Sequence, residues 1–326
     1  MDCINHKDPE RLQIVYGDTV FGVHGNGFHY LFSYQVGGME SLVIDGKEWL
    51  YRSPKPTFWR ATTCNDKGSG FPLRSGMWLS TDYFIRCSNI VLKIDGEEKK
   101  PQLGPENNQY STEEFASNAS ITFTYETITV PSTTVDVEYE MLPTGVINVN
   151  VHYHGNTSLP ELPVFGIRFI MPTMATSYRY EGLSGETYPD RMAGGVEGIY
   201  EIEGLPITKY LVPQDCNVHM KTKWVEVYRN TTKNNSDHGN EKFGLRVSSI
   251  PKEFAFSCIP YTAQELENAT HHEELPLPRR TVLSILGAVR GVGGINSWGA
   301  DVETEYHINA GEDICYSFQI SKAMLL

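Results

Sequence analysis

The stretch ITFTYETITVPSTTVDVEYEMLPTGVINVNVHY, residues 121–153, alternates apolar and polar side chains through three consecutive runs. Apolar residues occupy every second position of residues 121–125, 135–141 and 147–153. A period of two is that of a β-strand with one buried face, whereas a helix repeats every 3.6 residues. Pro143-Thr144-Gly145 separates the last two runs with residues that favour turns. The stretch therefore predicts neighbouring strands of an antiparallel sheet.

Strand signals continue on both sides of this stretch. Asp45-Gly46 follows an apolar run and predicts a hairpin turn. Helical signals are few: Thr262-Ala263-Gln264-Glu265 has the spacing of a capping box, and residues 77–84 could form a short helix. Other short β runs lie at residues 164–170, 243–247, 254–258 and 314–320.

The pattern as a whole predicts an all-β fold, a large antiparallel β-sandwich with few short helices. Residues 1–326 are expected to form a single domain, because 40% hydrophobic content is enough for a large core. The polar stretch 229–242 is interpreted as an exposed loop on this sandwich and not as a linker between two domains.

Charge and composition exclude several classes of function. The net charge is −13 and the isoelectric point is about 5.2, so the chain should repel nucleic acid and anionic lipid. No apolar run reaches the length of a membrane span, and charges occupy the start, MDCINHKDPERLQ, where a secretory peptide needs an apolar region. We expect a cytoplasmic protein that binds neither nucleic acid nor membrane.

Cysteines and histidines give no metal signature. The six cysteines contain no CxxC pair, which favours buried thiols in a reducing compartment over disulfides or a zinc site. His271-His272-Glu273-Glu274 is a dense cluster, but adjacent side chains of an extended segment point to opposite faces. We therefore expect no metal site in this chain.

Glu186 and Asp190 are the best isolated carboxylates for hydrolytic chemistry. Retaining hydrolysis of a glycosidic bond needs two carboxyl groups about 5–5.5 Å apart. Both residues lie in Glu186-Thr187-Tyr188-Pro189-Asp190-Arg191, where Arg and Tyr could position them. The favoured alternative is that Asp190 and Arg191 fix a loop by ion pairing and hydrogen bonds.

Two further segments combine glycine with aromatic or polar residues. GVGGINSWG, residues 291–299, could hold Trp298 on a loop as a platform for a sugar ring, although on the residues alone a core tryptophan is the better interpretation. FWRATTCNDKGSG, residues 58–70, suits a strand that leads into a mobile surface loop.

Four pieces of the chain together resemble the family formed by the C-terminal domains of family 2 β-galactosidases and the separate small subunits of two-chain β-galactosidases. The pieces occur in the family's order and span most of the chain: Phe58-Trp59-Arg60-Ala61 with Asn65-Asp66-x-Gly68; Glu186-x-Tyr188-x-Asp190-Arg191; Pro213 with Thr222-x-Trp224; and Gly291-Val292-Gly293-Gly294-x-x-Ser297-Trp298. The opening GGMESLVIDGKEWLYRSPKP, residues 37–56, adds to the match.

The resemblance implies a large sandwich of the galactose mutarotase-like kind and a site shared with a partner. Both catalytic glutamates, and the Mg²⁺ and possible Na⁺ sites, would belong to a large subunit with a TIM barrel, so this chain would hold no catalytic residue, metal or cofactor. Trp298 would stack on the β-galactoside, and Ser297 and Asn296 would also bind it. An active-site loop would comprise Asn65, Asp66, Lys67 and Gly68.

The sequence departs from the family in the loop before Asn65. Many relatives read Ala-Pro-x-Asp-Asn-Asp where this chain reads Ala61-Thr62-Thr63-Cys64-Asn65-Asp66. Thr62 and Cys64 thus replace Pro and Asp, which puts a role for that Asp in doubt.

Three functions compete on this evidence. The favoured one is a small, non-catalytic β-galactosidase subunit, which predicts no activity alone and an exposed apolar docking surface. The second is an aldose 1-epimerase-like enzyme, which would need its own acid and base. The third is a stand-alone carbohydrate-binding module, which would bind sugar without a partner.

Overall fold

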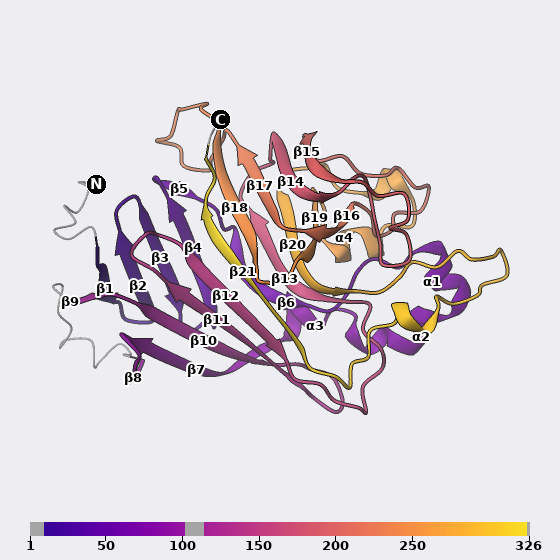
Figure 1. Ribbon diagram of the computed structural model, residues 1–326, viewed down its shortest axis with the longest axis horizontal. Coiled ribbons are helices and arrows are strands. Elements are labelled where there is room, and N and C mark those ends of the chain that lie inside the picture. Colours follow the sequence, from indigo (N-terminus) through magenta and orange to yellow (C-terminus); the bar gives the residue numbers. More distant parts are fainter. Residues whose placement is uncertain (1–9, 102–113, 325–326) are drawn as a thin grey trace.

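The computed structural model describes residues 10–101 and 114–324, and their strands form three sheets (Figure 1). Every strand pairing among these residues is antiparallel. The prediction of an all-β antiparallel fold with few short helices is confirmed.

The longest sheet has ten strands in the order β15-β14-β17-β18-β21-β12-β11-β10-β7-β8. Its strands are β7 (Arg86–Ile94), β8 (Glu97–Lys99), β10 (Ala119–Glu126), β11 (Thr134–Met141), β12 (Ile147–Tyr153), β14 (Ser177–Leu183), β15 (Glu197–Glu203), β17 (Trp224–Arg229), β18 (Phe243–Ile250) and β21 (Ile314–Lys322). The three alternating runs that opened the sequence analysis are β10, β11 and β12, and they pair in sequence order.

Two shorter sheets accompany it. The six-stranded sheet has the order β5-β4-β3-β2-β1-β9 and comprises β1 (Leu12–Tyr16), β2 (Val20–Gly25), β3 (Phe28–Ser33), β4 (Gly38–Ile44), β5 (Lys47–Glu48) and β9 (Glu114–Ala116). The five-stranded sheet has the order β16-β19-β20-β13-β6 and comprises β6 (Arg52–Thr57), β13 (Val164–Met171), β16 (Val218–Thr222), β19 (Phe254–Ile259) and β20 (Thr281–Val289).

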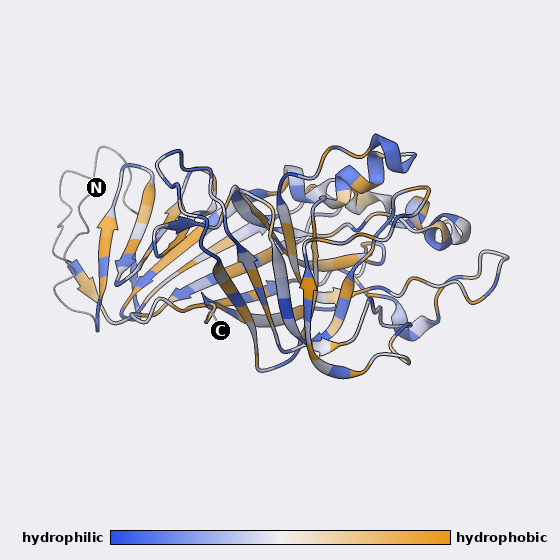
Figure 2. Ribbon diagram, turned by 90° about the horizontal axis from the view of Figure 1, so that it is seen from above, coloured by the Kyte–Doolittle hydropathy of each residue, from blue (hydrophilic) through white to orange (hydrophobic). Residues whose placement is uncertain are grey.

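A hydrophobic core joins the shorter sheets to one face of the ten-stranded sheet. Phe32 of β3 lies 6.4 Å from Phe123 of β10 between ring centroids, and Phe165 of β13 lies 5.4 Å from Tyr153 of β12. Strands show the alternation of apolar and polar residues along their length (Figure 2). The opposite face of β11 and β12 carries the polar residues of that alternation, which are partly exposed.

Turns and short helices follow the local signals. Asp45 and Gly46 both have positive φ, 49° and 72°, in the hairpin between β4 and β5. Thr262 caps a helix through reciprocal bonds with Glu265, as the capping-box spacing predicts. The described helices are α1 (Cys64–Ser69), α2 (Phe71–Ser75), α3 (Thr81–Phe84), α4 (Ala263–Asn268), η1 (Gly76–Trp78), η3 (His272–Glu274) and η4 (Thr304–Tyr306). No helix among the described residues is long and apolar enough to cross a membrane.

The thiols only partly follow expectation. Cys216 and Cys258 are buried, but Cys64 and Cys315 are exposed, which corrects the prediction of buried thiols. Cys64 begins a surface helix, and Cys315 pairs opposite an outward-facing residue of β12. Cys3 lies outside the described residues. Residues 230–242 form the predicted loop without helix or strand, but Arg229, which was expected in that exposed loop, is the buried last residue of β17.

Candidate functional site

Residues 64–69, expected to form a mobile loop, fold as helix α1. Thr63 is the N-cap: its hydroxyl accepts from the Asp66 N–H at 3.1 Å, and the Asp66 carboxylate accepts from the Thr63 N–H at 2.8 Å. This reciprocal pair satisfies two N–H groups that a helix start leaves without partners. Gly70 ends the helix in the left-handed conformation, with φ 73°. The structure thus corrects the expectation of a loop at these residues. The sequence already contained the capping signal for the helix, Thr63-x-x-Asp66.

Asp66 points into the protein and joins α1 to the glycine-rich segment. It is 2% exposed, and its carboxylate binds the Arg60 guanidinium at 2.7 and 3.1 Å and Arg290 at 3.3 Å. Arg60 also donates to the Gly291 carbonyl at 3.1 Å. Burial opposes the charge of Arg60, but the carboxylates of Asp66 and Asp215 leave its pKa raised above the ordinary value.

Other residues of the predicted active-site loop lie at the surface. Asn65, Lys67 and Gly68 are exposed. The Asn65 side-chain amide donates to the Val292 carbonyl at 3.0 Å, which places one edge of α1 against the glycine-rich segment. A Cβ built on Gly299 would lie 2.6 Å from the Gly68 carbonyl oxygen, so the two backbones approach too closely for any side chain at position 299.

Asp190 and Arg191 hold the base of the same segment. The Asp190 carboxylate accepts from the Val292 N–H at 3.0 Å and from the Gly293 N–H at 2.7 Å. Arg191 donates to the Gly293 carbonyl. The interpretation that these two residues fix a loop is therefore confirmed, with backbone hydrogen bonds as the means.

Glu186 serves a different segment. Its carboxylate accepts from the Asn217 N–H at 2.6 Å. Because Glu186 and Asp190 each bind separate backbone groups of their own chain, neither is set up as the acid or nucleophile of a hydrolytic pair.

The tip of the segment presents Trp298 to solvent. The Asn296 side-chain oxygen accepts from the Trp298 N–H at 2.9 Å and from the Ala300 N–H at 3.3 Å, which fixes a local turn. Trp298 is 91% exposed, and Ser297 is also exposed. The alternative of a core tryptophan is therefore wrong.

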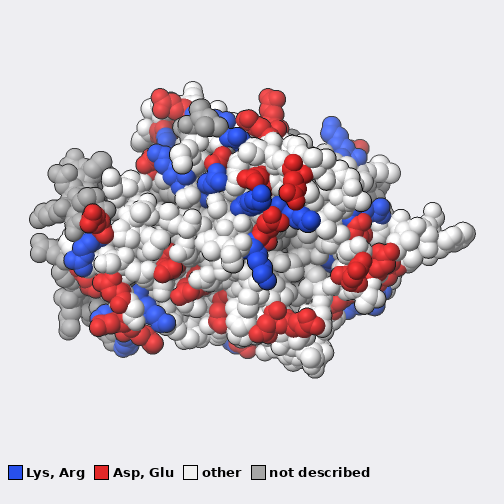
Figure 3. Space-filling view, viewed as in Figure 1, with Lys and Arg blue, Asp and Glu red and all other residues white. Residues whose placement is uncertain are grey.

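The segment projects from the end of the molecule opposite β1, beside α1 (Figure 1). Residues 291–300 contain no charged side chain, and the projecting end is free of charge on the visible face (Figure 3). An uncharged, exposed indole on a loop with a fixed base can bind the apolar face of a ring, such as a sugar.

Sequence reasoning missed the arginines beneath this segment. Arg290 is 1% exposed, and it binds Glu161 at 3.2 Å as well as Asp301. Asp301 also pairs with Arg74 of α2. The available signal was an arginine placed directly between the apolar strand β20 and GVGG.

Exposed apolar side chains occur on two of the short helices, α2 at this end and α3 nearer the middle of the molecule (Figure 1). The Arg74–Asp301 pair ties α2 to the segment, and Leu73 of α2 is 92% exposed. Phe84 of α3 is 63% exposed. Such residues are common at surfaces that bind another protein.

Comparisons with known proteins point to one family. The family model described as "Beta galactosidase small chain" matches residues 24–320. A "Beta-galactosidase small subunit" of Latilactobacillus sakei is 60% identical over 312 residues, which cover 96% of this chain and 98% of that protein. A "Beta-galactosidase" of Halalkalibacterium halodurans is 32% identical and matches 95% of this chain but only 28% of its own length. "Beta-galactosidase BgaC" of Bifidobacterium adolescentis is 31% identical, covering 92% of this chain and 26% of its own length.

A solved structure of a putative mutarotase from Salmonella typhimurium covers 100% of this chain and 97% of its own, at 9% identity and a TM-score of 0.47.

Proposed function

The chain belongs to the beta-galactosidase small-chain family, and from this premise we propose that it is the small, non-catalytic subunit of a two-chain β-galactosidase. The assembled enzyme would hydrolyse terminal β-D-galactosides such as lactose. The observation that carries this proposal is the 60% identity to a small subunit that it matches over nearly its whole length. Glu186 and Asp190, which each bind backbone groups elsewhere in the chain, are consistent with a non-catalytic role.

The partner in this proposal is a large subunit that carries the catalytic machinery of glycoside hydrolase family 2 in a TIM barrel. Such a barrel takes about 250 residues of alternating strand and helix. The chain spans about 28% of the length of the Halalkalibacterium halodurans relative, which leaves ample length for that barrel elsewhere.

Mg²⁺, and Na⁺ if it is required, would belong to that large subunit and supply charge stabilisation there. The carboxylates that pack beneath the segment here do not fit as ligands. Asp66 is occupied by two arginines, and Asp190 is occupied by two backbone N–H groups. We propose a cytoplasmic location for the assembled enzyme.

Trp298 is the substrate platform in this proposal. Its 91% exposure and its anchored base would let the indole reach a sugar in the partner's barrel, with Ser297 and Asn296 at its edge. Asn65, Lys67 and Gly68 would line the shared site. Asp66 would position the segment from below, because its carboxylate is turned inward.

The first test is activity on a chromogenic galactoside with this chain alone, with the candidate large subunit alone, and with both mixed. The proposal expects activity only in the mixture. Activity from this chain alone would overturn it. Sugar affinity of the isolated chain without complementation would instead favour a stand-alone carbohydrate-binding module, which the exposed Trp298 also permits.

The platform is tested in the assembled enzyme with Trp298→Ala. We expect a loss of galactoside binding or turnover with assembly intact, and partial recovery in Trp298→Phe, which restores an aromatic face. Ile295→Ala is the matched control, because Ile295 is 56% exposed in the same segment. Unchanged kinetic constants in Trp298→Ala would exclude the platform role.

A further inference from the structure

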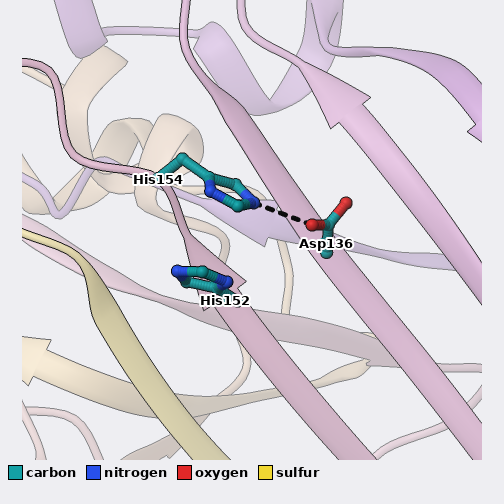
Figure 4. Close-up of side chains that lie close together, drawn as sticks. All are labelled: Asp136, His152 and His154. Carbon is teal, nitrogen blue, oxygen red and sulfur yellow. Dashed lines mark hydrogen bonds and ion pairs between the residues drawn. The ribbon is translucent and has the colours of Figure 1, made fainter.

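Three polar side chains meet on the outward face of the ten-stranded sheet, away from the Trp298 segment. Asp136 of β11 pairs directly opposite His152 of β12, and His154 directly follows the end of β12, where its N–H donates to the Thr134 carbonyl at 3.0 Å. Residues opposite each other in an antiparallel pair, and residues two apart along a strand, share a face. The strand geometry itself thus brings two imidazoles and one carboxylate together (Figure 4).

The distances suit a shared ligand. One donor atom from each of Asp136, His152 and His154 lies within 4.8 Å of the others. His154 Nε2 and Asp136 Oδ2 are 2.7 Å apart, and the two imidazole centroids are 3.9 Å apart. Donors bound to one tetrahedral zinc ion at about 2.0–2.1 Å lie roughly 3.3 Å apart. Small side-chain rotations would therefore bring all three donors onto one ion.

Neighbouring groups orient these donors. The Thr124 hydroxyl donates to Asp136 Oδ1 at 2.6 Å, which leaves Oδ2 facing His154. Asp313 Oδ2 lies 2.7 Å from His152 Nε2, and the Gly155 N–H donates to Asp313 Oδ1 at 2.8 Å. Histidines that bind metals usually give their second ring nitrogen to a carboxylate, and Asp313 has that position here.

The environment favours a cation that solvent can reach. The side chains of Asp136, His152 and His154 are 34–40% exposed. The chain carries a net charge of −13, which raises the local concentration of cations. Two imidazoles select for late first-row transition ions over Mg²⁺ or Ca²⁺, which prefer oxygen ligands.

We propose that Asp136, His152 and His154 form a binding site for a divalent transition-metal ion of the Zn²⁺ class, with Asp313 as the orienting carboxylate. The site lies on β11, on β12 and on the residue that directly follows β12, and it is independent of the proposed β-galactosidase function. It leaves one coordination position for water. A bound ion would cross-link two neighbouring strands of the longest sheet.

The test is calorimetric titration of the full chain with ZnCl₂ near neutral pH. We expect one saturable site per chain, with binding weakened at least about 10-fold in His152→Ala and in His154→Ala and about 10-fold or more in Asp313→Asn. The variant His271→Ala/His272→Ala is the matched control, because it removes an adjacent histidine pair elsewhere and should bind like the wild type. MgCl₂ should show no saturable binding at this site. Any Mg²⁺ binding should therefore be the same in the wild type and in the histidine variants.

A second test measures Zn²⁺ binding at the same site by its effect on thermal stability. Zn²⁺ should raise the thermal unfolding midpoint of the wild type and of the control, because an ion that binds only the folded state stabilises it. It should raise the midpoints of His152→Ala and His154→Ala by clearly less than that of the wild type. The proposal is overturned if the chain shows no saturable Zn²⁺ binding, or if binding of wild-type strength survives in both histidine variants.

Discussion

At the base of the 291–301 segment the charged side chains pair with one another and with the backbone, whereas the tip presents a large aromatic side chain to solvent. Asp66 and Asp190 tie the base to α1 and to the 186–191 segment through buried or partly buried contacts. Trp298, only a few residues further on, is 91% exposed. The residues at the base therefore position the segment, whereas Trp298 at the tip is presented to solvent.

The base is costly to build, which argues that its geometry matters. Moving Arg60, Arg290 and Asp66 out of water carries a desolvation penalty that their mutual attraction has to offset. Replacing buried ion pairs by well-packed apolar residues of similar volume often preserves the stability of a protein. The ionic contacts also fix the orientation of the segment, because Arg60 donates a hydrogen bond to the Gly291 carbonyl at its start.

The largest effect should come from breaking the ionic base. Asp66→Ala leaves Arg60 and Arg290 buried without their shared carboxylate, so we expect a loss of about 3–5 kcal/mol in the free energy of unfolding. Urea unfolding of the full chain measures it. Asp237→Ala, which removes the partner of the more exposed Lys47, is the control and should cost less. Equal losses in the two variants would contradict a special role for the base.

Asp215 offers a second test of the charges around Arg60, through pH. Burial raises the pKa of Asp215 to about 6, although Arg60 and a hydrogen bond from Tyr188 at 2.8 Å oppose the rise. The contribution of this carboxyl to stability is present below about pH 4 and is lost as the pH rises to about 6. At neutral pH the ionised form costs on the order of 3 kcal/mol.

Asp215→Asn should therefore stabilise the chain at neutral pH and flatten the pH dependence between about 4 and 6. Tyr188→Phe is the matched variant: it removes a bond to the carboxylate, so the slope should move to higher pH. Urea unfolding across this pH range gives both results. A variant Asp215→Asn with the wild-type slope would disprove the assignment.

A smaller loss of stability is expected where the base holds the segment only by hydrogen bonds to its backbone. Asp190→Ala leaves the N–H groups of Val292 and Gly293 without their acceptor, at a cost of about 1–3 kcal/mol. Hydrogen exchange at these two amides should accelerate. Glu186→Ala, which frees the Asn217 N–H instead, should leave their exchange unchanged. Slow exchange in Asp190→Ala would mean that the segment is held by something else.

The fold was predictable because apolar and polar residues alternate along its strands. Strands β10, β11 and β12 bury Ile121, Val137 and Val149 on one face, and a period of two can be seen in the sequence without knowledge of neighbours. The loop-fixing role of Asp190 and Arg191 was also predictable. Helix α1 was missed although Thr63-x-x-Asp66 is a capping signal, because glycine and polar residues around it favoured a loop.

What could not be predicted depends on register. Asp136 and His152 are 16 positions apart in sequence and become neighbours only because β11 and β12 pair with Asp136 opposite His152. A shift of one residue would send one of them to the opposite face of the sheet. Arg290 and Asp66 are separated by 224 positions, and only the packed structure brings them together. The single-domain prediction for residues 1–326 and the substrate role of Trp298 stay predictions.

The smallest effect on stability should be at the tip. Trp298→Ala should change the free energy of unfolding of the full chain by no more than about 0.5 kcal/mol, because little of the indole is buried. Trp78→Ala is the matched control: Trp78 is fully buried, stacks on Phe58 at 5.3 Å and donates to the Pro160 carbonyl, so its loss should cost about 3–5 kcal/mol. Urea unfolding compares the two. A large loss in Trp298→Ala would mean that the tip packs within its own chain. A negligible loss, combined with impaired turnover of the assembled enzyme, would mean that the tryptophan acts only where another surface meets it.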